Sequence, residues 1–329
     1  MKYKRMGSAG IKVSSLCMGT MTFGSEADET ESARLYSAAR DKGINFFDCA
    51  NLYAGGKSEK ILGELIKKHR EEVVISSKAY YPVNSYAGHN PITWGRGLNR
   101  THVRRAVDES LKRLDTDYID VYYMHHFDDD CSLEESLSIY NDLVREGKIN
   151  YIGLSNMSAW QYMKAAGICR QYNYAPISAI QPMYNLLKRQ CESEILPMAM
   201  SEEMGVFSYS PLAGGVLTGK YLSDEKDTVQ GRLNNMKMYK ERYKARKNTD
   251  ISRDFIAYAN ENGINPISLA VAWVGSHPGI TAPIIGGRSV EQIKPSLDAA
   301  DIELTDEMRQ DLNHLSDTPE PATDRSEET

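Results

Sequence analysis

The segment GINFFDCANLYAGGKSEKILG, residues 43–63, contains a complete strand, loop and helix unit. Its apolar run at 44–48 predicts a buried strand that ends on Asp48. A loop of small residues and glycines follows, and residues 59–69 have the amphipathic pattern of a helix. Because a strand followed directly by a helix is the building unit of parallel α/β folds, the segment predicts one βα unit.

The same unit recurs along the whole chain. Strands are predicted at 16–19, 44–48, 73–78, 119–125, 151–155, 179–181, 206–209 and 282–285. Helices are predicted at 30–42, 59–69, 101–114, 133–146, 159–171, 192–204, 267–276 and 290–299. Eight strands, each followed by a helix, predict an α/β fold of the (β/α)8 TIM-barrel type.

Four other regions complete the predicted domain. YKRMGSAGIKV at 3–13 predicts an N-terminal β-hairpin that caps the barrel floor. Residues 80–99 and 221–250 are predicted to be long loops, a feature that is often functional. We expect one domain over 1–315, followed by a disordered acidic tail at 316–329.

The bulk composition limits the class of protein. With 329 residues, 41% of them hydrophobic, the chain can bury the core of one large barrel. A net charge of -6 and a pI near 5.7 disfavour nucleic acid as a partner. Five cysteines without a CxxC pair are typical of a reducing compartment. No signal peptide and no membrane-spanning stretch is recognisable, so we expect a cytoplasmic protein.

Polar residues end six consecutive predicted strands. They are Asp48, Lys78, His125, Ser155 with Asn156, Gln181, and Tyr209 with Ser210. The carboxyl ends of barrel strands meet at one mouth, so these residues are expected to form one ring. Taken alone, Asp48 is better explained as a turn or helix cap. A buried carboxylate and a buried ammonium are costly unless they meet, which favours a pair between Asp48 and Lys78.

Tyr53 follows Asp48 by five residues and is a candidate acid. A tyrosine has an ordinary pKa of about 10, and a nearby ammonium lowers it. Asp48 would keep Lys78 charged, and His125 would orient a substrate carbonyl group. These four residues predict proton donation to a carbonyl while a cofactor delivers hydride, because side chains cannot supply hydride.

Two loops contain glycines suited to binding the phosphates of such a cofactor. No GxGxxG motif is present. Gly214, Gly219 and Lys220 follow the seventh strand and resemble a P-loop, but Tyr221 replaces its Ser/Thr, which disfavours an NTPase. Arg288 follows the eighth strand just before a helix and suits a 2′-phosphate. Ordinary turns are the alternative explanation of the glycines.

Longer motifs resemble the aldo-keto reductase superfamily from about residue 3 to 297. They are MGTMTFG (18–24), GINFFDCANLYAGGKSEKILG (43–63), SSK (76–78), SLKRLDTDYIDVYYMHH (110–126), GLSN (153–156), QPMYNLL (181–187) and SPLAGGVLTGKY (210–221). The resemblance implies a barrel that reduces aldehydes or ketones, or oxidises the alcohol, with NADP(H) preferred, NAD(H) possible and no metal. The chain looks nearest to the branch of bacterial and fungal aryl-alcohol dehydrogenase-like reductases and potassium-channel beta-subunit-like proteins.

The resemblance also implies roles for individual residues. The catalytic tetrad falls on Asp48, Tyr53, Lys78 and His125, with Tyr53 as proton donor. Cofactor binding falls on Gly19, Thr20, Met21, Ser155, Asn156, Gln181, Tyr209, Ser210, Pro211, Leu212, Gly214, Leu217, Gly219, Lys220, Gly286, Arg288 and Gln292. Pro295 and Ser296 stand where many relatives carry Glu-Asn, which leaves the adenine contacts open.

The substrate is expected to be a small carbonyl compound or alcohol. Candidate pocket residues are Phe23, Tyr81, Trp94 and His126, although the aromatic loop residues fit packing on one another equally well. Successive strand residues face opposite sides, so adjacent His125 and His126 do not favour a metal site. A redox-sensing regulatory subunit with little turnover is the alternative function, and the intact tetrad favours an enzyme.

Overall fold

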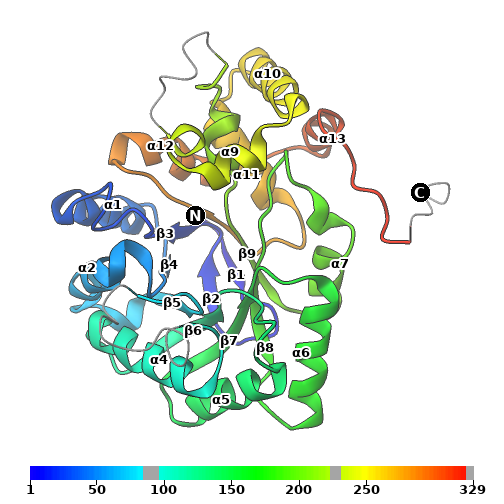
Figure 1. Ribbon diagram of the computed structural model, residues 1–329. Coiled ribbons are helices and arrows are strands. Elements are labelled where there is room, and N and C mark those ends of the chain that lie inside the picture. The colour runs from blue at the N-terminus through cyan, green and yellow to red at the C-terminus, as the bar shows by residue number, and fades with distance from the viewer. Residues whose placement is uncertain (84–95, 223–230, 324–329) are drawn as a thin grey trace.

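The computed structural model describes residues 1–83, 96–222 and 231–323, and its centre is a closed barrel of eight parallel strands (Figure 1). Around the barrel the strands follow the order β10-β3-β4-β5-β6-β7-β8-β9. They are β3 (Cys17–Gly19), β4 (Phe46–Asp48), β5 (Val74–Ala79), β6 (Ile119–Met124), β7 (Ile149–Ser155), β8 (Ile177–Gln181), β9 (Gly205–Ser208) and β10 (Ala282–Ile285). Each predicted strand overlaps an observed one, and the predicted (β/α)8 barrel is confirmed.

Helices surround the barrel and connect successive strands (Figure 1). The helices that were predicted are α1 (Glu29–Asp41), α2 (Lys57–Ile66), α4 (Arg100–Leu114), α5 (Leu133–Arg145), α6 (Ala159–Gln171), α7 (Ile195–Ser201), α11 (Pro266–Ser276) and α12 (Val290–Asp298). Side chains cap several of them, as where Asp28 accepts from the Glu31 N–H at the start of α1. In the described part of the chain, none of these helices has the length and apolar character needed to cross a membrane.

The N-terminal hairpin closes one end of the barrel, as predicted. Strands β1 (Tyr3–Arg5) and β2 (Lys12–Ser14) pair antiparallel. Met6 and Val13 of this hairpin belong to the same buried cluster as Phe46 and Val74, the first residues of β4 and β5. The hairpin therefore covers the amino-terminal ends of the strands and leaves the opposite mouth for chemistry.

The segment that follows β9 is more helical than the predicted long loop. It contains α8 (Arg232–Asn235), α9 (Lys237–Tyr243) and α10 (Arg246–Glu261), and α13 (Asp306–His314) follows α12. Helix α10 buries Asn248, Ser252, Phe255 and Ala259. Its first five residues, 246–250, are all polar, so this end of the helix has no apolar residue by which it could be told from the charged loop predicted up to residue 250.

Part of the predicted acidic tail packs against the barrel. Nη1 of Arg189 donates to Oγ of Ser316, Ser193 donates to the Glu320 carbonyl, and Lys247 pairs with Asp317. These contacts do not fit a disordered chain over residues 316–320. Residues 324–329 lie outside the described residues, and the domain boundary at 315 stays a prediction.

Candidate active site

A cavity of about 780 Å³ lies at the carboxyl ends of the strands. Its volume is in the range of sites that bind cofactors and drug-sized ligands. The predicted site residues on its wall are Gly19, Met21, Asp48, Tyr53, Tyr81, His125, His126, Asn156, Gln181, Tyr209, Ser210, Pro211, Leu212, Gly214, Lys220, Gly286, Arg288 and Gln292. Residues from distant parts of the sequence are thus brought into one site.

Several predicted residues lie behind this wall and support it. Lys78 is fully buried beneath Asp48. Oγ1 of Thr20 donates to the Asp48 carbonyl, and Oγ of Ser155 donates to the Gln181 carbonyl. Leu217 and Gly219 are likewise outside the residues that line the cavity.

Two predicted substrate residues are not found on the wall. Phe23 is fully buried in the hydrophobic core, and its N–H donates to the Thr20 carbonyl in the turn that follows β3. That position corrects its assignment to the substrate pocket. Trp94 lies outside the described residues.

A tight turn brings Tyr53 back over the end of β4. The turn η1 (Tyr53–Gly56) leads into α2, and Ala54, Gly55 and Gly56 have φ values of 49°, 64° and 90°. Glycine adopts this left-handed region without the penalty that a Cβ imposes. The glycines after Tyr53 therefore allow its hydroxyl group to face the strand ends.

Asp48 and Lys78 form a buried ion pair at the base of the cavity. Nζ of Lys78 donates to Oδ2 of Asp48 over 2.7 Å, to the Cys49 carbonyl over 2.6 Å and to Oη of Tyr53 over 3.5 Å. Burial lowers the pKa of Lys78, but Asp48 and Tyr53 raise it more, so the net pKa lies above its ordinary value. Lys78 is therefore an ammonium ion beside the Tyr53 hydroxyl group.

Tyr53 holds its proton more tightly than the sequence predicted. Burial raises the pKa of Tyr53 to about 12, although the Lys78 ammonium lowers it. The ammonium can be recognised in the sequence, whereas the burial of Tyr53, which has the larger effect on its pKa, depends on the fold. Tyr53 is consequently protonated throughout the physiological range and is ready to act as a proton donor.

His125 is a neutral side chain next to Tyr53. Its ring centroid lies 6.4 Å from that of Tyr53 and 5.4 Å from that of Tyr81. Burial, then the charges of Lys78 and His126, hold the pKa of His125 well below its ordinary value. A neutral imidazole can donate one hydrogen bond to a carbonyl oxygen. Among the described residues, no three His, Cys, Asp or Glu side chains are grouped to hold a metal ion.

The amide side chains of Asn156 and Gln181, which were predicted to bind the cofactor, form hydrogen bonds along the wall. Nε2 of Gln181 donates to Oδ1 of Asp48 over 2.9 Å. Nδ2 of Asn156 donates to the His125 carbonyl over 2.9 Å, and Oη of Tyr209 donates to Oδ1 of Asn156 over 2.7 Å. The Gln181 contact links the predicted cofactor site directly to the ion pair.

Cations gather on another part of the wall. Lys220, Arg232, Arg242 and Arg288 all line the cavity. Burial lowers the pKa of Lys220, and the nearby charges of Arg288 and Arg232 lower it further. Lys220, Arg232 and Arg288 are therefore three neighbouring cations, which are suited to bind an anion such as a phosphate. This part of the wall fits the phosphates of a dinucleotide.

The start of α12 is less available to an anion than the sequence predicted. The Val290 N–H donates to Oε1 of Glu31, and the Gln292 N–H donates to Oγ of Ser289. The Arg288 N–H donates to Oε1 of Gln292. These first-turn amides already have acceptors, so anion binding here depends mainly on the side chains of Arg288 and Lys220.

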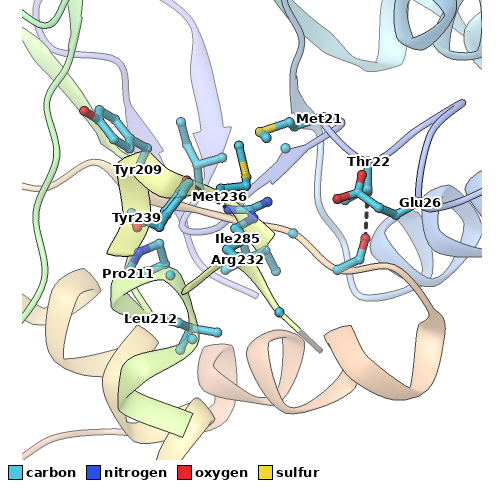
Figure 2. Close-up of a pocket in the computed structure, with 18 of the residues that line it drawn as sticks. Met21, Thr22, Glu26, Tyr209, Pro211, Leu212, Arg232, Met236, Tyr239 and Ile285 are labelled. Atoms are coloured by element: carbon cyan, nitrogen blue, oxygen red, sulfur yellow. Dashed lines mark hydrogen bonds between the residues drawn. The ribbon is translucent and has the colours of Figure 1, made fainter. Parts of the chain in front are cut away.

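The segment after β9 contributes wall residues that sequence reasoning missed. Figure 2 shows Arg232, Met236 and Tyr239 facing the cavity across from Met21 and Glu26. The guanidinium of Arg232 lies 5.6 Å from the Tyr239 ring centroid. Met236 and Tyr239 are three residues apart, a helical spacing, and basic residues lie next to them. This pattern could have indicated a helix that contributes to the site, but the segment was predicted as a loop.

Comparison of the sequence with known proteins identifies the protein family. The profile of the Aldo/keto reductase family matches residues 15–317. The chain belongs to the aldo/keto reductase family. It is 37% identical to an uncharacterized oxidoreductase, YrpG, of Bacillus subtilis (strain 168), over 97% of each chain. It is 34% identical to a probable voltage-gated potassium channel subunit beta of Arabidopsis thaliana, over 92% of each chain.

A putative aryl-alcohol dehydrogenase of Schizosaccharomyces pombe is 31% identical, over 96% of this chain and 95% of its own. The predicted family and branch are confirmed. This member of the aldo/keto reductase family is an NAD(P)H-dependent oxidoreductase of carbonyl compounds, and its substrate is a small molecule.

Proposed function

We propose that the protein reduces an aldehyde or ketone to the alcohol, or catalyses the reverse oxidation, with Tyr53 as general acid or base. The observation that carries the proposal is the contact chain from Asp48 through Lys78 to Tyr53, with distances of 2.7 Å and 3.5 Å. It ends on the wall of the cavity, where Oη of Tyr53 can meet a substrate.

Each member of the tetrad has a distinct task in this mechanism. When bound, NADPH supplies the hydride that forms the new C–H bond at the carbonyl carbon. Tyr53 gives its proton to the carbonyl oxygen, and Lys78 stabilises the phenolate that remains. His125 donates a hydrogen bond to the same oxygen, and Asp48 holds Lys78 in place. Solvent then returns a proton to Tyr53.

We infer that NADP(H) is preferred over NAD(H). Lys220, Arg232 and Arg288 place three cations on one cavity wall, whereas Glu26 and Asp48 are the carboxylates among its described lining residues. The 2′-phosphate of NADPH adds about two negative charges that such cations attract. A redox-sensing subunit remains the alternative to turnover, and the contact chain to Tyr53 supports turnover.

Tyr53→Phe tests the proposed acid. The variant keeps the ring and loses the proton, so the reduction rate is expected to fall by about 10²- to 10⁴-fold. NADPH affinity, measured by the fluorescence of the reduced cofactor, is expected to stay within about twofold, because the ring still lines the cavity. Tyr172→Phe, an exposed tyrosine away from the cavity, is the matched control. Equal reduction rates for both variants would exclude Tyr53 as the donor.

A further inference from the structure

Strand β5 alternates between the barrel interior and the surrounding helices. Ser76 and Lys78 are two residues apart and both contact Asp48, so both face the interior. Ser77 lies between them and faces the other way, where its Oγ donates to Oε1 of Glu59 over 2.6 Å. Ser76 and Ser77 are both fully buried, which makes them a matched pair on opposite faces of one strand.

Ser76 contacts one specific oxygen of Asp48. Oγ of Ser76 donates to Oδ1 over 2.7 Å, and Nε2 of Gln181 donates to the same oxygen over 2.9 Å. Oδ2 accepts from Nζ of Lys78 over 2.7 Å. Ser76 and Asp48 are also paired neighbours in the β4–β5 register, so their positions are fixed by the barrel itself. The two neutral donors occupy one oxygen and leave the other for the ammonium.

The other titratable groups around this pair carry no charge, except Glu59 on the opposite face of β5, whose carboxylate is paired with Arg113. Burial raises the pKa of Cys17, of Cys49 and of Tyr123, and burial also raises the pKa of Tyr53. His125 is neutral, as described above. The Asp48 carboxylate is therefore the anion that holds the Lys78 ammonium, and its orientation determines where the ammonium lies.

We propose that Ser76 is a positioning residue for the reaction: its hydrogen bond to Oδ1 fixes the Asp48 carboxylate so that Oδ2 holds the Lys78 ammonium beside Oη of Tyr53. The role rests on the proposed function of Tyr53 as the proton donor. Ser76 is fully buried and is not among the residues that line the cavity, so its side chain is not positioned to bind a ligand there. Its contribution should therefore appear in the proton-transfer step and not in ligand binding.

The experiment compares Ser76→Ala with Ser77→Ala in the full chain. Without the Ser76 donor the carboxylate can rotate, the ammonium moves away from Tyr53 and the phenolate is less stabilised. We expect kcat for reduction to fall roughly tenfold, the factor that corresponds to one pKa unit. The KM of the carbonyl substrate and the Kd of NADPH, read by cofactor fluorescence, should stay within about twofold. Ser77→Ala should keep its kcat.

Two further readouts separate positioning from a general loss of structure. In Ser76→Ala the solvent deuterium isotope effect on kcat should increase, because proton transfer becomes more rate-limiting. Alcohol oxidation by Ser76→Ala should be slower than in the natural sequence at each pH between 7 and 9, because the phenolate of Tyr53 forms less readily. Ser76→Thr keeps the hydroxyl group and should restore most of kcat, whereas Ser76→Cys, close in shape but a weak donor, should resemble Ser76→Ala.

The outcomes distinguish this proposal from the proposed function. If Tyr53→Phe still reduces the substrate, the assignment of the donor fails. If Tyr53→Phe is inactive but Ser76→Ala and Ser76→Cys keep kcat and an unchanged isotope effect, the role of Ser76 alone is overturned. An equal loss in Ser77→Ala, or a loss confined to KM or NADPH affinity, would also overturn it.

Discussion

Asp48→Asn is the change that most directly tests the buried ion pair. Asparagine has nearly the same shape as aspartate, but it cannot balance the charge of Lys78. The side chains of Lys78 and Asp48 are 0% and 4% exposed, and the pair is 2.7 Å long, so solvent cannot replace the lost carboxylate. Among the described residues, the partners that Lys78 keeps are the Cys49 carbonyl and Tyr53, and these, like the asparagine amide, carry no charge. The variant must either bury an unpaired ammonium or release its proton.

The loss of unfolding free energy can be calculated from the cost of releasing the Lys78 proton. A lysine has an ordinary pKa of about 10.4, so deprotonating it at pH 7 costs about 4.6 kcal/mol. The free-energy cost of burying the unpaired ammonium cannot exceed this value, because Lys78 would then lose its proton instead. The range of about 3–5 kcal/mol for removing one partner of a buried pair agrees with this limit. We therefore expect Asp48→Asn to lose about 4 kcal/mol of unfolding free energy at pH 7.

The stability of Asp48→Asn is expected to change with pH in one direction. In Asp48→Asn the folded state binds fewer protons than the unfolded state, so stability rises with pH. The deficit should shrink to about 2 kcal/mol at pH 9, as the pH approaches the ordinary pKa of lysine. In the natural sequence the pKa of Lys78 is raised, so its stabilising contribution is fully present below about pH 10.4 and is lost only at higher pH.

Urea unfolding at pH 7 and pH 9 measures both quantities. The double variant Asp48→Asn with Lys78→Met removes the ammonium, and it should recover most of the lost stability while staying inactive. The reasoning is refuted if the double variant is as unstable as Asp48→Asn, or if the deficit is the same at both pH values. Either result would mean that packing, and not the uncompensated charge, explains the loss.

Two further predictions concern the cofactor and the direction of the reaction. Arg288→Ala should weaken NADPH binding by about tenfold or more and NADH binding much less, as measured by cofactor fluorescence, because only NADPH has the 2′-phosphate; equal weakening would show that Arg288 does not read that group. Because burial raises the pKa of Tyr53 to about 12, alcohol oxidation should speed up with rising pH between pH 7 and 9 while reduction stays nearly constant, and a flat oxidation profile would exclude Tyr53 as the base.

The repeated strand and helix units, and the polar residues at the ends of the strands, could be predicted from the sequence. Alternating apolar runs and amphipathic segments are local patterns, so all eight barrel strands could be predicted. The close approach of Asp48, Lys78 and His125 could be predicted because a barrel places the carboxyl ends of its strands together, whereas their catalytic roles stay a prediction. Errors arose where position depends on packing. Phe23 follows the first strand closely, yet its ring is buried in the core.

Long-range partners could not be predicted from spacing. Arg232 reaches the cavity because α8 and α9 fold over it, and the polar residues 246–250 conceal the start of the helix that follows. The contact between Gln181 and Asp48 joins positions 133 residues apart in the sequence. The periodic pattern of apolar residues does not predict such a contact, because the contact depends on the closure of the barrel and on side-chain length.

The pKa of Tyr53 shows why composition alone gives an incomplete account of this site. The sequence identifies an ammonium that lowers the pKa, but only the fold reveals that burial raises it more. A raised pKa does not oppose the proposed role, because a donor must keep its proton until hydride reaches the carbonyl carbon. The Lys78 ammonium matters most once negative charge develops on Oη, 3.5 Å away. Its stabilisation is therefore larger in the transition state than in the ground state, which is the condition for lowering the barrier.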